Sequence, residues 1–275
     1  MAQQKLTAHH SSGGRVEEIE RGWRLSIPAG DSDSYRLAQL DDYARLPRRR
    51  FPHRFSSTFS LLARTSSDSI PGTWGFGLWN DPFGLSLGFG GNPFRLPALP
   101  NAVWFFGASK ENYLSFKDIR AERNEVKTKR GASSTGEAMN ASPSALRVAA
   151  NGFIAQSFRS PRFHPLLIAA GVVFPFSRKA TRRMLGRIIG EDGVAVGVDV
   201  TEWRRYSLTW EEKRVSLEVD NVEVFESAVS PNPPLGLVIW IDNQYAAFTP
   251  EGKIGFGVLA NPEPAWLEIK DLEIG

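Results

Sequence analysis

The chain contains TEWRRYSLTW at residues 201–210, VSLEVDNV at residues 215–222 and PPLGLVIWIDN at residues 233–243. Apolar and polar residues alternate in the first two stretches, which predicts strands with one buried face. The Asp220-Asn221 dipeptide in the second stretch favours a tight hairpin turn. The third stretch is apolar over several consecutive residues and then becomes polar, as expected of a buried strand. Together these stretches predict a curved antiparallel sheet.

The order of these elements resembles that of the concanavalin A-like lectin/glucanase superfamily, and most closely that of the laminarinase-type glycoside hydrolases of family 16. In that family a W-x-x-Y-x-(I/L)-x-W strand precedes a (Y/E)-V-D-G hairpin. The chain has the first pattern at residues 203–210 and a Val-Asp-Asn variant of the second at residues 219–221. The resemblance implies an all-β, single-domain antiparallel β-sandwich of the jelly-roll type, and a carbohydrate as ligand or substrate.

The composition is that of a single globular domain. The chain has 275 residues, and all-β sandwiches of this length often form one domain. Its eight Trp and eighteen Phe can build a large core, and 25 Gly with 18 Pro suit many short strands joined by turns. There is no Cys for a disulfide or a thiolate ligand, and the four His are scattered, so we expect no metal and no cofactor. A net charge of +3 does not call for a nucleic-acid partner.

Strand-like segments follow one another from residue 23 to residue 275, and we assign this range to the sandwich. Residues 1–22 are predicted to be a mobile tail, and residues 118–145, which are polar and rich in Ser and Gly, a mobile loop. A helical insertion is predicted over residues 164–190, where the apolar period changes from that of a strand to that of a helix. The N-terminus lacks the apolar segment of a secretory signal, so the expected location is cytoplasmic.

One carboxylate motif has the letters of the family's catalytic pattern. Glu218, Asp220 and Glu223 fit the E-x-D-x-x-E pattern that carries the nucleophile, its helper and the acid/base in laminarinase-like hydrolases. Such chemistry needs carboxylates on one face of a strand, but the Asp-Asn turn divides this motif, and we interpret it as a hairpin without chemistry. No strand predicted before residue 203 has two carboxylates at alternate positions, which disfavours laminarinase-type hydrolysis.

Two W-x-D elements, at residues 79–81 and 240–242, are the main candidate site. A Trp and an Asp two residues apart in a strand project from the same face, and an indole ring beside a carboxylate can hold a pyranose. We therefore predict glycan binding on the concave face of the sheet. The alternative is that each Trp belongs to the core and each Asp begins a turn. The predicted stacking rings are Trp79 and Trp240, and the predicted polar contacts are Asn80, Asp81, Asp242, Asn243 and Gln244.

Two further functions remain open. If the sheet brings Asp81 and Asp242 to within about 5 to 10 Å of each other, the pair could act as the acid and base of a glycosidase or of another enzyme. If the aromatic side chains line a cavity, the ligand would instead be an apolar small molecule or a lipid. The sequence does not separate a lined cavity from a filled core. The aromatic residues concerned are Trp74, Trp79, Trp104, Phe106 and Trp240.

The segment from Ser177 to Gly190 has the pattern of a basic amphipathic helix, with a Ser suited to the N-cap and a Gly suited to the end. A helix of this kind is typical of peripheral membrane contact. The alternative, which we favour, is a helical cap on the sandwich with a solvated basic face. The basic residues are Arg178, Lys179, Arg182, Arg183 and Arg187.

Overall fold

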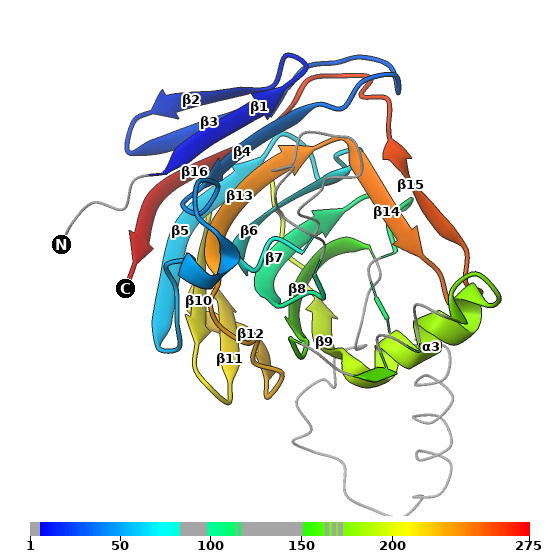
Figure 1. Ribbon diagram of the computed structural model, residues 1–275. Helices are drawn as coiled ribbons and strands as arrows, with labels where there is room; N and C mark the ends of the chain where they lie inside the picture. The colour runs from blue at the N-terminus through cyan, green and yellow to red at the C-terminus, as the bar shows by residue number, and fades with distance from the viewer. Residues whose placement is uncertain are drawn as a thin grey trace, which may run out of the picture.

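Two stacked antiparallel sheets of seven strands each, named sheet A and sheet B, form the body of the protein (Figure 1). A two-stranded ribbon lies outside them. This arrangement confirms the predicted all-β sandwich. The computed structural model describes residues 6–82, 98–113, 115–116, 151–162, 165–166, 169 and 173–275.

The strands of each sheet are given in spatial order. Sheet A consists of β1 (Thr7–Ser11), β4 (Leu37–Asp41), β13 (Gly236–Asp242), β6 (Thr73–Trp79), β7 (Ala102–Ala108), β8 (Gly152–Arg159) and β9 (Gly190–Ala195). Sheet B consists of β12 (Val222–Ser227), β11 (Val215–Val219), β10 (Arg204–Trp210), β5 (Ser57–Thr65), β16 (Ala265–Ile274), β3 (Gly22–Ile27) and β2 (Arg15–Ile19). The ribbon consists of β14 (Gln244–Phe248) and β15 (Ile254–Val258), and the helical elements are η1 (Arg48–Arg50) and α3 (Arg178–Ile188).

Sheet A has a core on each of its faces. In β13, Leu237, Ile239 and Ile241 point into the space between the sheets, whereas Val238 and Trp240 point to the opposite, concave face. The split follows from strand geometry, since successive side chains point to opposite sides of a sheet. A strand in this position needs apolar residues throughout, and every residue of β7 is indeed buried.

The second core is the concave-face cluster. Helix α3 lies on this side of sheet A, together with the β14–β15 ribbon (Figure 1), and its Leu185 and Ile188 pack against the cluster. The helix begins where the sequence predicted, since Ala180 N donates to the Ser177 hydroxyl at 3.2 Å. The main buried members of the concave-face cluster are Tyr43, Phe51, Trp104, Phe106, Phe158, Val238 and Trp240.

The N-terminal stretch differs from its prediction. Within residues 1–22, which the sequence assigned to a tail, residues 7–11 form β1 beside β4, and residues 15–19 form β2 beside β3. Both strands lie at a sheet edge and contain mostly half-buried or exposed residues, so main-chain hydrogen bonds suffice to hold them. Strands of this kind carry little apolar alternation, which is why the pattern did not reveal them. The predicted mobile loop at 118–145 lies outside the described residues.

The hairpin between β11 and β12 is as predicted. Asp220 and Asn221 both have positive φ, 51° and 63°, as the two central residues of a type I′ turn require. Glu218 and Glu223 face each other across the hairpin in sheet B, on neighbouring strands. The E-x-D-x-x-E letters therefore describe a turn and not three carboxylates along one strand.

Candidate functional site

The three predicted tryptophans gather on the concave face of sheet A. Trp79 of β6 and Trp240 of β13 lie on adjacent strands with their rings nearly parallel, 4° apart, and their centroids separated by 6.1 Å. Trp104 of β7 lies 5.9 Å from Trp79 and 5.8 Å from Trp240. The strand pairing thus brings together rings that are far apart in sequence.

Glycines of β6 make room for these rings. A Cβ atom added to Gly75 would lie 2.8 Å from the Trp240 ring, and one added to Gly77 would lie 2.6 Å from the Trp104 Cβ. Both distances are too short for a real contact. The alternation of glycine with bulky residues in residues 73–79 therefore serves the approach of neighbouring indoles.

The rings fill a core and do not form an open platform. Trp240 is only 6% exposed and Trp104 only 4% exposed, and each contacts the Phe106 ring as well. Trp74 lies on the opposite face of β6, in the inter-sheet core. The proposed apolar cavity lined by all of these rings is therefore not formed. Trp79 is partly exposed, and it stands at the end of β6, where the strand leaves the sheet.

The acid pair suggested by the sequence is not assembled. In the antiparallel pairing of β6 with β13, Trp79 lies opposite Gly236 and Thr73 lies opposite Asp242. Six strand residues, or about 20 Å at some 3.4 Å per residue, separate these two pairs, and Asp81 lies two residues beyond the first of them. This distance exceeds the separation that either glycosidase mechanism uses, and it excludes a joint acid/base role for Asp81 and Asp242.

Asp242 belongs to a buried hydrogen-bond chain. Its Oδ1 accepts from the Thr73 hydroxyl at 2.7 Å and from Gln244 N at 3.2 Å, and its Oδ2 accepts from the Tyr35 hydroxyl at 3.2 Å. The Thr73 hydroxyl in turn accepts from Trp240 Nε1 at 2.9 Å. Burial raises the pKa of Asp242 to about 6, although these hydrogen bonds act in the opposite direction. The carboxyl group is buried, and its hydrogen bonds hold the end of β13.

Asn243, which follows Asp242, has a structural role as well. Asn243 is completely buried; its Oδ1 accepts from Arg36 N at 2.8 Å and its Nδ2 donates to Leu259 O at 2.7 Å. Gln244 is the first residue of β14. Asn243 thus fixes the crossing from β13 to the ribbon, whereas a ligand contact by the Gln244 side chain stays a prediction.

The opposite end of the same strands carries an open cleft of about 800 Å³, which we name the arginine cleft. It lies where β6 and β8 end and where β7 and β13 begin. Of the residues predicted from the sequence, Asn80 lines it. Its described lining consists of Arg48, Arg49, Arg54, Asn80, Ala98, Leu99, Asn101, Pro161, Arg162, Asn232, Pro233 and Pro234.

Three asparagines hold the base of the arginine cleft. Asn80 Nδ2 donates to Leu99 O at 2.9 Å and Asn80 Oδ1 accepts from Asn101 N at 3.0 Å, which ties the end of β6 to the beginning of β7. Asn101 Oδ1 accepts from Ser160 N at 3.1 Å and from Asn232 N at 2.8 Å. These amides join four chain segments, so the base of the cleft is fixed before any ligand binds.

The sequence did not predict that the four arginines of the cleft lie together. Three of them lie in the connection between β4 and β5, and the fourth follows β8, so about a hundred residues separate the two groups. Arg48 Nε donates to Asn80 O at 2.8 Å, Arg54 Nη1 to Phe51 O at 2.7 Å and Arg162 Nη2 to Pro233 O at 3.0 Å. The basic stretch at residues 45–54 contains three of these arginines, but nothing in the sequence indicates that it lies beside residue 162.

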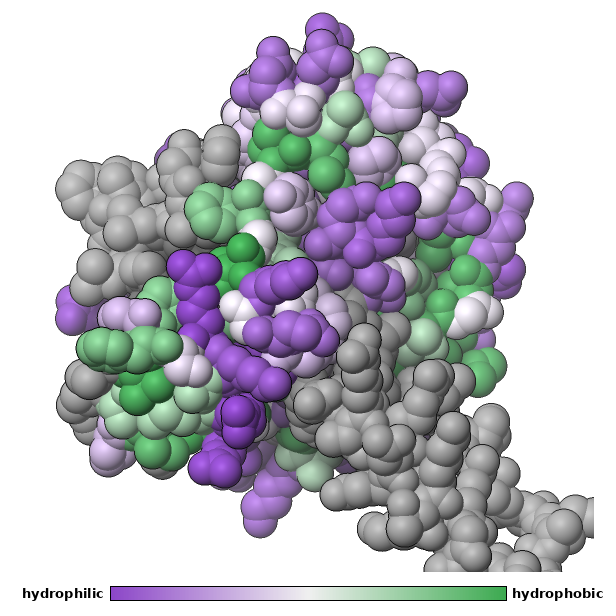
Figure 2. All heavy atoms as spheres, turned by 90° about the vertical axis from the view of Figure 1, so that its right-hand side faces the viewer, coloured by the Kyte–Doolittle hydropathy of each residue, from purple (hydrophilic) through white to green (hydrophobic). Residues whose placement is uncertain are grey.

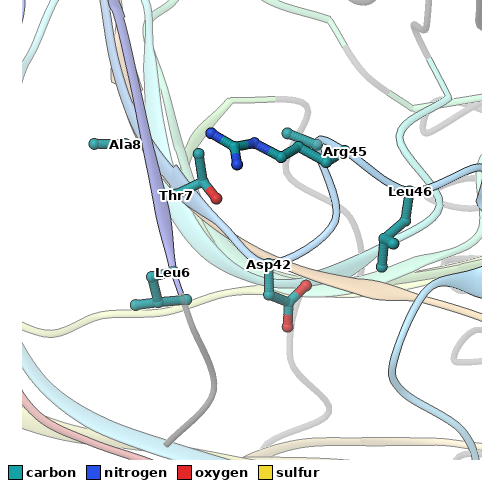
Figure 3. Close-up of a pocket in the computed structure, with 7 residues that line it drawn as sticks. Leu6, Thr7, Ala8, Asp42, Arg45 and Leu46 are labelled. Atoms are coloured by element: carbon teal, nitrogen blue, oxygen red, sulfur yellow. The ribbon is translucent and has the colours of Figure 1, made fainter.

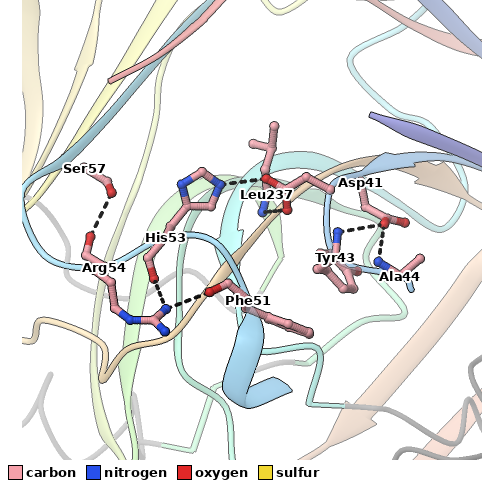
Figure 4. Close-up of polar contacts among 9 residues, drawn as sticks. Asp41, Tyr43, Ala44, Phe51, His53, Arg54, Ser57 and Leu237 are labelled. Carbon is pink, nitrogen blue, oxygen red and sulfur yellow. Dashed lines mark hydrogen bonds and ion pairs between the residues drawn. The ribbon is translucent and has the colours of Figure 1, made fainter. Parts of the chain in front are cut away.

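A smaller pocket of about 390 Å³ lies beside β1, and its lining includes Thr7, Asp42 and Arg45 (Figure 3). Both carboxylate oxygens of Asp42 have partners within the protein. Its Oδ2 lies 2.7 Å from His53 Nε2, and its Oδ1 accepts from Leu237 N at 2.9 Å (Figure 4). The pair anchors the β4–β5 connection, and with it the cleft arginines, to the beginning of β13. We assign this pocket no ligand.

Neither a metal site nor a membrane-spanning helix is found in the described part of the chain. The His, Asp and Glu side chains described form no group of three or more that could hold a metal ion. Similarly, no described helix is long and apolar enough to cross a membrane.

Comparison with known proteins gives structural similarity only. No family model and no curated protein matches the chain. Among solved structures, it is similar to a glycoside hydrolase family 16 endo-glucanase from Bacteroides ovatus (9% identity, 100% of this chain and 96% of the other, TM-score 0.45). It is also similar to LamAcat from Zobellia galactanivorans (12% identity, 92% and 79%, TM-score 0.41) and to the binding domain of botulinum neurotoxin DC (6% identity, 98% and 42%, TM-score 0.42). No site residue is carried over at this similarity.

Proposed function

We propose that the protein binds a glycan and that the binding site is the arginine cleft. The observation that carries this proposal is the combination of volume and lining. A cleft of about 800 Å³ lies within the usual range for ligand sites, which combine apolar walls with a few fixed polar groups. Leu99 and three prolines supply the apolar walls here, and guanidinium and amide groups supply the polar ones.

The resemblance of residues 203–221 to glucanases favours a carbohydrate over other ligands of this size. The glycosidase alternative based on Asp81 and Asp242 is abandoned, because the two carboxylates lie at opposite ends of the strands. The proposed ligand site therefore differs from the one that the sequence predicted. The concave face, where the sequence placed the ligand, is occupied by buried rings, whereas the cleft at its edge is open.

A blocking substitution tests the site. Ala98 lines the cleft and is exposed, so Ala98→Trp should fill part of the volume without disturbing the core. We expect wild type to bind members of a glycan array and Ala98→Trp to bind them at least about tenfold more weakly in calorimetry, a loss of about 1.4 kcal/mol or more.

The matched control is Val222→Trp on β12, where the side chain is 64% exposed and far from the cleft in sheet order. It should bind like wild type. Failure of the wild-type protein to bind any saccharide, or full affinity in Ala98→Trp, would contradict the proposal.

We also propose that a second surface contacts an anionic membrane. Four large apolar side chains are exposed near the beginning of α3 and along β15: Phe174, Phe176, Ile254 and Phe256. The β14–β15 turn contacts the beginning of α3, since a Cβ added to Gly252 in this turn would lie 2.7 Å from Lys179 N. On this side of the molecule hydrophobic and strongly hydrophilic residues lie next to each other (Figure 2).

The charge of α3 complements an anionic surface. The helix contains five basic and no acidic residues. Arg182 must be removed from the predicted basic face, because it is 3% exposed and donates to Phe248 O and Ser115 O. Arg178, Lys179, Arg183 and Arg187 remain exposed. Apolar side chains beside cations are the composition of an interfacial contact.

A further inference from the structure

We infer that the glycan bound by the arginine cleft is acidic, carrying carboxylate or sulfate groups. This inference rests on the proposed function and specifies its ligand. It starts from charge: four arginines line the cleft, and the described lining residues include no Asp or Glu. Guanidinium groups stay protonated throughout the physiological pH range, so the cleft carries a permanent positive charge.

Three of the cleft arginines differ from the ion-paired arginines of sheet B. On sheet B, Arg24 and Arg64 both pair with Glu268, at 2.6 Å and 2.8 Å. Within the described part of the chain, by contrast, no carboxylate pairs with Arg49, Arg54 or Arg162. Among the described residues, these three charges therefore have no partner of opposite sign.

The hydrogen bonds that the arginines do make orient them without neutralising them. Arg54 Nη1 donates to Phe51 O and His53 O, and Arg162 Nη2 donates to Pro233 O. All three acceptors are uncharged carbonyls. A guanidinium has five N–H donors, so each of these groups keeps donors for a ligand. The planar fork suits the two oxygens of a carboxylate or a sulfate.

The walls of the cleft favour a saccharide over a nucleic acid. None of the described lining residues is aromatic, and single-stranded nucleic acids are held largely by bases stacked on aromatic rings. Pro161, Pro233, Pro234 and Leu99 provide apolar contact for the C–H face of a sugar ring, and the asparagine amides between them are fixed. An acidic sugar would satisfy both the apolar walls and the charge.

Calorimetry with oligosaccharides of equal length tests the inference: one neutral, one built from uronic acids and one sulfated. We expect wild type to prefer at least one acidic oligosaccharide by about tenfold or more, as the loss of a charge-assisted hydrogen bond would imply. The preference should shrink as NaCl is raised, because salt screens exposed charges. Comparison of the uronic and sulfated ligands tells which anion the cleft accepts.

The variants are Arg49→Gln and Arg162→Gln, with Arg45→Gln as the matched control. Arg45 is an exposed arginine of the same connection, but it lines the smaller pocket. The two cleft variants should lose most of the preference for the acidic ligand, and Arg45→Gln should keep it. Equal affinity for neutral and acidic ligands, or an undiminished preference in both cleft variants, would overturn the acidic ligand but leave glycan binding intact.

Two other outcomes separate the inference from the proposed function. Absence of binding to every saccharide would overturn both. Displacement of the acidic oligosaccharide by inorganic sulfate at equal concentration, or tighter binding of a single-stranded oligonucleotide, would show an anion site that does not recognise sugars. Circular dichroism should confirm that each variant is folded before its binding is interpreted.

Discussion

Asp242 shows how one buried carboxyl group makes stability depend on pH. Its pKa in the folded protein is about 6, against an ordinary value of 3.8, because burial disfavours the charged form. Between these two values the folded state holds a proton that the unfolded state has released. The free energy of unfolding therefore decreases as the pH rises from about 4 to about 6, and it levels off above that range.

Replacing Asp242 by Asn should remove this dependence. At 1.36 kcal/mol for each pKa unit, the shift of the Asp242 pKa contributes about 3 kcal/mol to the free energy of unfolding at low pH. Between pH 4 and pH 7 the free energy of unfolding of wild type should therefore fall by up to that amount relative to that of Asp242→Asn. Denaturant unfolding of both proteins at several pH values measures the difference. Asp68→Asn, in an exposed turn, serves as the control and should follow wild type. A constant difference between wild type and Asp242→Asn would refute the role assigned to burial.

At the scale of elements, β6 fits its neighbours only because two of its residues lack a side chain. A Cβ at Gly75 would lie 2.4 Å from Phe105 O and 2.8 Å from the Trp240 ring. Neither atom can move easily, because Phe105 O belongs to the backbone of β7 and Trp240 is packed among other rings. The geometry of the concave-face cluster is thus set by glycine in one strand and tryptophan in the next.

We expect Gly75→Ala to lower the free energy of unfolding by about 1 to 3 kcal/mol, the range typical of overpacked cores. Gly197→Ala is the matched control, since a Cβ there meets nothing within 4 Å and the residue does not need a positive φ. The control should leave stability unchanged within about 0.5 kcal/mol. Equal stability of Gly75→Ala and wild type would show that the cluster can yield to admit the methyl group.

At the scale of the whole molecule, the sandwich separates two surfaces. The arginine cleft lies at the strand ends where β6 and β8 leave sheet A. Helix α3, by contrast, lies on the concave side beside the β14–β15 ribbon (Figure 1), and the exposed phenylalanines precede this helix or lie on β15. Each surface can therefore be altered without changing the other. This independence makes the glycan and membrane proposals separately testable.

Vesicle co-sedimentation tests the membrane surface. The full-length protein should bind vesicles containing an anionic phospholipid but not vesicles of zwitterionic lipid alone, and binding should weaken as salt is added. Phe176→Ser combined with Arg183→Gln and Arg187→Gln should abolish it. The control is Arg214→Gln. Arg214 is an exposed residue in the turn just before β11, and this variant should bind anionic vesicles like wild type. If wild type ignores anionic vesicles at low salt, α3 is only a cap on the sandwich.

The sequence alone determined the features that depend on neighbouring residues. The alternation in residues 215–219 predicted a strand, the Asp220-Asn221 turn required positive φ at two positions, and Ser177 began a helix. These features are local, since side-chain period and backbone conformation are fixed within a few residues. The same reasoning missed β1, because a polar edge strand is held by main-chain bonds that leave no mark in the side-chain pattern.

The tertiary structure alone decided what the candidate residues do. Both W-x-D elements lie on adjacent strands, but antiparallel pairing puts Asp81 at one end and Asp242 at the other. The apolar run at residues 235–241 indicated a buried strand, but only the packing on the concave face shows that Trp240 is covered there and not exposed to a ligand. The arginine cleft joins Arg49 to Arg162, which no spacing rule connects, because strand order and register, and not sequence distance, determine which loops meet.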